Sequence, residues 1–118
     1  MTGMVDPSVD VVWASVAITI DRTGEHDERP KNDAEWVNVQ NHAMIVAEAA
    51  NLLMVAPRAR DNGDWMTLSR TLREAAAKAY EAALKHDADA LLSIGGEIYD
   101  ACAGCHKKYV PPGQGEAF

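Results

Sequence analysis

The sequence lacks the motifs of several common enzyme classes. It contains no glycine-rich phosphate-binding loop and no nucleophile–base signature of a hydrolase. No Glu-x-x-His pair occurs, so a di-iron carboxylate bundle is not indicated either. We therefore expect that the chain is not an enzyme.

Long apolar runs are also missing. The longest, residues 11–20, contains Ser15 and Thr19 and is far too short to cross a bilayer. The first four residues have neither the basic region nor the apolar stretch of a secretory signal. We expect a single globular domain over residues 1–118, with no membrane span and with no export signal in this chain.

Positive charge is scarce as well. The chain has 11 Lys and Arg against 18 Asp and Glu, which gives a formal net charge of −7. An acidic surface repels nucleic acid and anionic lipid, so we expect neither as a partner. The charge favours a partner protein with a basic docking face, although it would equally serve solubility alone.

What is present is a helical pattern. Apolar residues recur at steps of three and four, which predicts four helices: residues 7–22 with Asp6 as N-cap, residues 32 or 33 to 55, a third helix with Asp64 as N-cap, and a fourth from near Asp87 to before Pro111. Residues 25–32 are expected to form a loop. In each helix these apolar residues form one stripe, and the connections between the helices are short. Together these features predict an all-α, antiparallel up-down-up-down four-helix bundle.

The two cysteines of the chain lie in one motif, Cys102-Ala103-Gly104-Cys105-His106. C-x-x-C-H is the attachment sequence of a c-type haem, in which both thiols form thioether bonds to one porphyrin. The histidine that follows is then held beneath the iron as proximal ligand. We predict Cys102 and Cys105 as cofactor-binding residues, His106 as the iron ligand and one covalent haem c as the cofactor.

Two alternatives to haem attachment fit the sequence less well. A redox dithiol usually opens a helix after a strand, and no strand is predicted upstream of this motif. A structural zinc ion needs four nitrogen or sulfur ligands at recurring spacing, and His26, His42 and His86 do not provide it. Haem attachment outside the cytoplasm requires export, so we expect a periplasmic protein.

With this motif near the end of a fourth helix, the chain resembles the cytochrome c prime family, the class II c-type cytochromes. Tyr109, three positions after His106, matches the family pattern, whereas Val110 stands where a basic residue is common. The family's Arg-Gln pair and nearby Met of the first helix are absent. The resemblance implies a haem-bearing four-helix bundle that often forms homodimers, but it assigns no sixth iron ligand here.

The sixth iron ligand and the function therefore stay open. In an antiparallel bundle Met4 and Met54 fall near the haem end, so either is a candidate ligand, and the third choice is an iron with no sixth ligand. A His- and Met-bound haem favours electron transfer, and an open iron favours binding of NO or CO. Arginines near this end are candidate propionate partners: Arg58, Arg60, Arg70 and Arg73.

Overall fold

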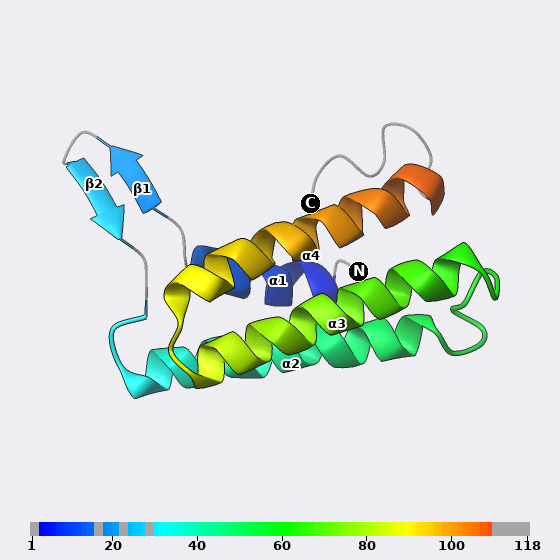
Figure 1. Ribbon diagram of the computed structural model, residues 1–118, viewed down its shortest axis with the longest axis horizontal. Coiled ribbons are helices and arrows are strands. Elements are labelled where there is room, and N and C mark those ends of the chain that lie inside the picture. Colours follow the sequence, from blue (N-terminus) through cyan, green and yellow to red (C-terminus); the bar gives the residue numbers. More distant parts are fainter. Residues whose placement is uncertain (1–2, 16–17, 22–23, 28–29, 110–118) are drawn as a thin grey trace.

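The computed structural model describes residues 3–15, 18–21, 24–27 and 30–109. Its elements are α1 (Val5–Ala14), β1 (Ile18–Asp21), β2 (Gly24–Asp27), α2 (Asp33–Leu53), α3 (Asp64–Leu84) and α4 (Ala88–Tyr109). The three long helices lie side by side and reverse direction at each connection, and α1 packs against α2 and α4 (Figure 1). The predicted four-helix, all-α core is confirmed. None of the described helices is long and apolar enough to cross a membrane.

Two helix starts follow the local capping chemistry that the sequence predicts. The side chain of Asn32 accepts a hydrogen bond of 2.9 Å from the backbone N–H of Glu35 at the start of α2. At the start of α4 the carboxylate of Asp87 accepts one of 3.0 Å from the N–H of Ala90. Each bond satisfies a backbone donor that has no partner within its helix.

The first helix was predicted too long. It begins at Val5, with Met4 rather than Asp6 as N-cap, and ends at Ala14. β1 and β2 follow and pair antiparallel, with Ile18 opposite Asp27, so part of the predicted loop is strand. β-Branched side chains such as those of residues 18–20 favour the extended backbone, and here that preference outweighs their helical spacing. Val16, another residue of the predicted seam, lies outside the described residues.

The second and third helices differ from prediction only at their ends. α2 stops at Leu53 rather than residue 55. Asp64 is the first helical residue of α3 and not its N-cap, because the N-cap position belongs to Gly63, which has no side chain to accept a bond. The capping acceptor is instead the carboxylate of Asp61, which receives the N–H groups of Gly63 at 2.9 Å and Trp65 at 3.1 Å.

Small residues let the helices of the bundle approach closely. Alanines on α2 and α3 are completely buried: Ala50, Ala76, Ala79 and Ala83. On α4, Gly95 accepts the indole N–H of Trp13 of α1 at its carbonyl, 3.1 Å away. A Cβ at Gly95 would stand 3.3 Å from the Trp13 ring, so the glycine allows the close contact, and α4 continues through it.

α1 covers only part of the bundle. It has 10 residues, against 21 or 22 in each long helix, and its chain direction runs from the middle of the bundle toward the α3–α4 turn (Figure 1). The charge of Asp6, in its first turn, acts on Cys102, which places the start of α1 near that residue. Beyond Cys102, therefore, no fourth helix accompanies the three long helices among the residues that the structure describes.

Candidate functional site

The C-x-x-C-H motif lies in the last turns of α4, at the end of the bundle where α2 meets α3. Cys102 is buried, Cys105 is half-buried, and both are free thiols. Residues three apart on a helix share a face, so both thiols point toward the other long helices. His106 is half-buried, with its Nδ1 atom fully covered. The structure thus brings the three predicted residues together at one end of the bundle.

A small apolar pocket adjoins the motif. Its volume is about 20 Å³, enough for roughly one water molecule. The lining from the other helices consists of Leu53 from α2 with Leu68, Leu72 and the buried Ser69 from α3. The donor set and apolar surroundings fit a porphyrin, but the enclosed space does not. Attachment of a haem inside the bundle therefore requires these leucines, or the end of α4, to move aside.

Burial keeps both thiols protonated. Loss of hydration raises the pKa of Cys102 to about 11, and the charges of Asp6 and Cys105 act in the same direction. Burial also raises the pKa of Cys105. Near neutral pH both side chains are therefore S–H groups rather than thiolates, which makes them slow nucleophiles and poor metal ligands while the helix is closed.

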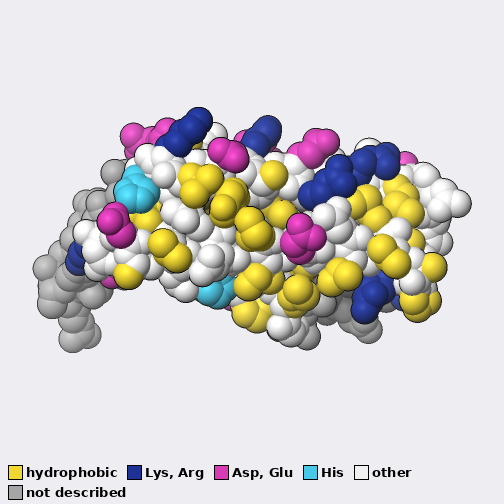
Figure 2. Space-filling view, turned by 90° about the horizontal axis from the view of Figure 1, so that it is seen from below, with side chains coloured by type: hydrophobic (Ala, Val, Ile, Leu, Met, Phe, Trp, Pro, Cys, Tyr) yellow, Lys and Arg dark blue, Asp and Glu magenta, His cyan; other side chains and the backbone are white. Residues whose placement is uncertain are grey.

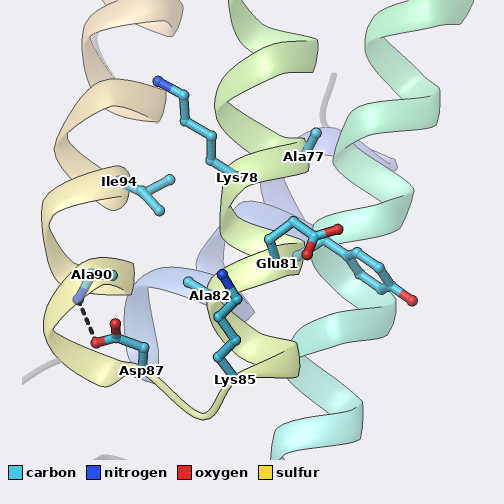
Figure 3. Close-up of a pocket in the computed structure, with 9 residues that line it drawn as sticks. Ala77, Lys78, Glu81, Ala82, Lys85, Asp87, Ala90 and Ile94 are labelled. Carbon is cyan, nitrogen blue, oxygen red and sulfur yellow. Dashed lines mark hydrogen bonds between the residues drawn. The ribbon is translucent and has the colours of Figure 1, made fainter.

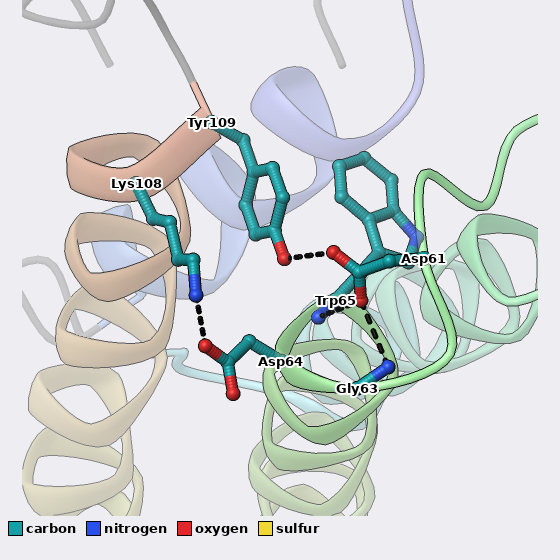
Figure 4. A network of polar contacts seen from close by, with 6 residues as sticks. All are labelled: Asp61, Gly63, Asp64, Trp65, Lys108 and Tyr109. Carbon is teal, nitrogen blue, oxygen red and sulfur yellow. Dashed lines mark hydrogen bonds and ion pairs between the residues drawn. The ribbon is translucent and has the colours of Figure 1, made fainter.

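The end of α4 is fastened to the start of α3 by polar contacts that the sequence did not predict. The hydroxyl of Tyr109 donates a hydrogen bond of 2.5 Å to Asp61, and the ammonium of Lys108 pairs with Asp64 (Figure 4). The ring of Tyr109 packs edge-on against Trp65, with 4.9 Å between ring centroids. We call the cluster Asp61, Asp64, Trp65, Lys108 and Tyr109 the end clamp.

The end clamp also reaches α2 and shifts the acidity of its members. The indole of Trp65 donates to the carbonyl of Leu53 at 2.6 Å, next to the apolar pocket. The hydrogen bond with Tyr109 lowers the pKa of Asp61, and the same bond raises the pKa of Tyr109 to about 12. Both shifts favour the bonded form, phenol with carboxylate. The Asp61-Asn62-Gly63 turn was the sequence signal nearest to this contact.

Neither predicted methionine lines the pocket. Met54 is the half-buried C-cap of α2, and Met4, the N-cap of α1, is 40% exposed. Of the candidate propionate partners, Arg73 donates to the side chain of Asn51 at 3.2 Å, and Arg58, Arg60 and Arg70 are exposed. The sixth ligand and the propionate partners stay predictions.

The other histidines lie away from the motif. Nδ1 of His42 is 2.7 Å from the carbonyl oxygen of Asn38, and His86 stacks on Trp36 with 4.9 Å between ring centroids. Trp36 and His86 belong to the opposite end of the bundle, as expected, and His26 lies on β2. Within the described ranges, no group of three or more His, Cys, Asp or Glu side chains is arranged to hold a metal ion.

Two larger hollows lie elsewhere and contain neither cysteine. One, of about 460 Å³, lies between α3 and α4 near their connecting turn, with Lys78, Lys85, Glu81 and Asp87 around an apolar floor (Figure 3). The other, of about 380 Å³, lies between α1 and α2. Their charges are mixed, so neither selects a ligand of one sign.

Comparison of the chain with protein-family models, with curated proteins and with solved structures finds no match.

Proposed function

We propose that the chain is a c-type haem protein that carries electrons, with one haem attached through Cys102 and Cys105 and its iron bound by His106. The observation that supports this is the placement of the motif. The two cysteines are not joined to each other and share the inward side of α4, beside His106 and against leucines of two other helices. A dithiol or a zinc site would need neither the histidine at that position nor the apolar surroundings.

The cysteines supply the attachment chemistry directly. In the proposed attachment each S–H would add across one vinyl group, so that sulfur bonds to one vinyl carbon, hydrogen goes to the other, and no atom leaves. A cysteine thiol ordinarily has a pKa of about 8.5, so each would carry the required hydrogen at neutral pH. Once bound, the group supplies a reversible one-electron couple at its iron. The chain's part is then to hold His106 in place and to exclude water with Leu53, Leu68 and Leu72.

The test is the mass of acid-denatured protein from a host with haem-attachment machinery. The intact chain should carry one haem that acid and organic solvent do not remove. The Cys102→Ser/Cys105→Ser double variant should carry none. Unmodified chain with two free thiols from that host, alongside a control cytochrome that is loaded normally, would contradict the proposal.

The leucine lining of the pocket supports a second candidate, a five-coordinate haem protein that binds NO or CO. Leu53, Leu68 and Leu72 offer no ligand to a metal, and neither Met4 nor Met54 is among the residues that line the pocket. A largely apolar pocket of this kind would favour small neutral gases as the remaining ligand of a haem iron held by His106. Visible spectra of the reduced protein with and without CO separate the two. Immediate CO binding favours gas binding, and a low-spin spectrum that changes in Met54→Ala or Met4→Ala favours electron transfer.

We place the loaded protein in the periplasm, because covalent attachment of haem c takes place after export. A homodimer is proposed on the resemblance alone, and Val37 and Met44 are exposed apolar side chains of α2 that such a contact would cover.

A further inference from the structure

The charges of this acidic chain are unevenly distributed. At the end of the bundle that carries the motif lie six basic residues, which we call the basic end: Arg58, Arg60, Arg70, Arg73, Lys107 and Lys108. Within the described segments 54–73 and 101–109 only two acidic residues accompany them, Asp61 and Asp64. In Figure 2 the largest group of Lys and Arg side chains accordingly lies toward the right-hand end, where α2 meets α3.

Both of these carboxylates are already engaged. Asp64 pairs with Lys108, and Asp61 accepts bonds from Tyr109 and from two backbone N–H groups. In the part of the chain that the structure describes, exposed basic residues of this end form no ion pair: Arg58, Arg60, Arg70 and Lys107. Farther toward the middle lie Asp6, Glu48, Glu74 and Asp100, which together with Asp61 and Asp64 equal the six basic residues in number, so the positive excess is confined to the outermost part of this end.

The opposite end is acidic. The first turns of α2 and α4 and the end of α3 carry Asp33, Glu35, Glu81, Asp87 and Asp89 against Lys31, Lys78 and Lys85. The molecule is 46 Å long. Charge interactions fall with distance, and in about 0.15 M salt they are screened over about 8 Å. A surface that approaches the motif end-on therefore meets the local positive charge and very little of the distant negative charge.

We infer that the basic end is the docking surface for a redox partner whose contacting face is acidic. This rests on the proposed function, which puts the electron-carrying group at this end. It reverses the sign of the partner surface that the net charge of −7 suggests. The proposed electron transfer needs a partner that gives or takes an electron at this end, which a redox protein supplies and a lipid bilayer or a nucleic acid does not. The observations therefore favour a protein.

The sign of the local field can be measured with small redox reagents on the haem-loaded protein. Hexacyanoferrate(III), an anion, takes one electron from the reduced iron, and hexaammineruthenium(III), a cation, does the same. We expect the rate with the anion to fall by up to about tenfold as KCl is added, and the rate with the cation to rise or stay constant. A rate that rises with salt for the anion and falls for the cation would overturn the inference.

A pair of variants with the same net charge locates the effect. Arg60→Gln/Arg70→Gln removes two positive charges from the basic end, and Lys31→Gln/Lys85→Gln removes two from the other end. At low salt the first should slow hexacyanoferrate(III) several-fold, and the second should leave its rate within about 1.5-fold. Equal slowing by both would show that only net charge matters and would contradict a basic docking end.

Two further measurements show whether a negative result contradicts the proposed function or only the docking surface. Mass spectrometry of each variant shows whether haem is attached. Absent haem refutes the proposed function, whereas normal haem with the wrong salt dependence refutes only the docking surface. Vesicles of phosphatidylserine and phosphatidylcholine should not bind the protein in about 0.1 M salt. Vesicle binding that Arg60→Gln/Arg70→Gln abolishes would assign the basic end to a membrane instead.

Discussion

At the scale of single residues, His106 differs from the other histidines in what surrounds it. It stands directly after Cys105 with its Nδ1 covered, whereas His42 faces a backbone carbonyl of its own helix. We expect His106→Ala to shift the Soret and visible bands of the haem-loaded protein strongly, because it removes the proximal ligand. His42→Ala is the matched control and should leave them unchanged. An equal change in both would indicate two histidine ligands.

The bond between Tyr109 and Asp61 predicts an unusual titration. In the folded protein the phenol should lose its proton near pH 12, against about 10 for a free tyrosine. Because the folded pKa is raised, the stability from this bond is fully present below about pH 10 and is lost as the pH rises through about 12. At the acid side it is lost as the pH falls below the ordinary range of Asp61, whose pKa is lowered.

Ring-carbon chemical shifts of Tyr109 against pH measure this titration. Asp61→Asn should return the midpoint toward about 10, since the amide carries no charge to favour the phenol. Asp64→Asn is the control, because it leaves the Tyr109–Asp61 bond in place. A midpoint near 10 in the unaltered protein would show that the end clamp does not form in solution.

At the scale of elements, alanine substitutions at the neighbouring glycines Gly95 and Gly96 of α4 distinguish the effect of helix propensity on stability from the effect of packing. Gly96 faces open space, so Gly96→Ala should stabilise the protein by about 0.5–1 kcal/mol. A Cβ at Gly95 would crowd the Trp13 ring at 3.3 Å, so Gly95→Ala should be less stable than Gly96→Ala by about 1 kcal/mol or more.

Urea denaturation of the two alanine variants gives the comparison directly. Trp13→Phe provides a check, because it removes the indole N–H bonded to the Gly95 carbonyl and part of the crowding ring. In that background the difference between the two alanine variants should shrink. Equal stabilisation by both in the unaltered chain would mean that α1 does not rest on Gly95.

How much of the fold was predictable depends on how local its causes are. α2 and α4 could be predicted because nearby residues specify each of them. Apolar side chains recur every three or four positions along each helix, and a capping residue, Asn32 or Asp87, stands at its start. The strand pair could not, because residues 16–20 also satisfy a helical spacing. At the site the motif alone identified the three candidate residues, Cys102, Cys105 and His106, which the structure places together. The end clamp was missed because Tyr109 and Asp61 are 48 positions apart, and exposed polar contacts leave no periodic pattern.

At the scale of the whole molecule, the net charge does not show that basic and acidic residues gather at opposite ends of the bundle. The net charge of −7 counts each charge without its position, whereas the bundle holds Arg58 and Asp33 at opposite ends. Only the order of the helices reveals this separation, because it gathers segments 54–73 and 101–109 at one end. The net charge can be counted from the sequence, but the sign of the local charge that a partner would meet at the motif depends on the fold.

The short α1 predicts unequal protection along α4. The inward face of residues 91–98 packs against α1 and α3, and Leu91 and Ile98 are completely buried. Among the described residues, no fourth helix packs on 103–109, which are held by the end clamp. Amide hydrogens of 103–109 should therefore exchange at least about tenfold faster than those of 91–98, through local opening rather than global unfolding. Uniform exchange along α4, measured by NMR in deuterium oxide, would contradict this.

The lower protection expected for residues 103–109 has a consequence for the order in which the chain would fold and bind haem. The hydrophobic core is closed around Val9, Val12 and Val46, and it extends to Leu72 and Cys102 beside the pocket. Under the proposed function such a chain could fold first and bind haem afterwards, once Leu53, Leu68 and Leu72 or the last turns of α4 move aside. The haem-free protein would then be a folded intermediate, protected from proteases, rather than an unfolded chain.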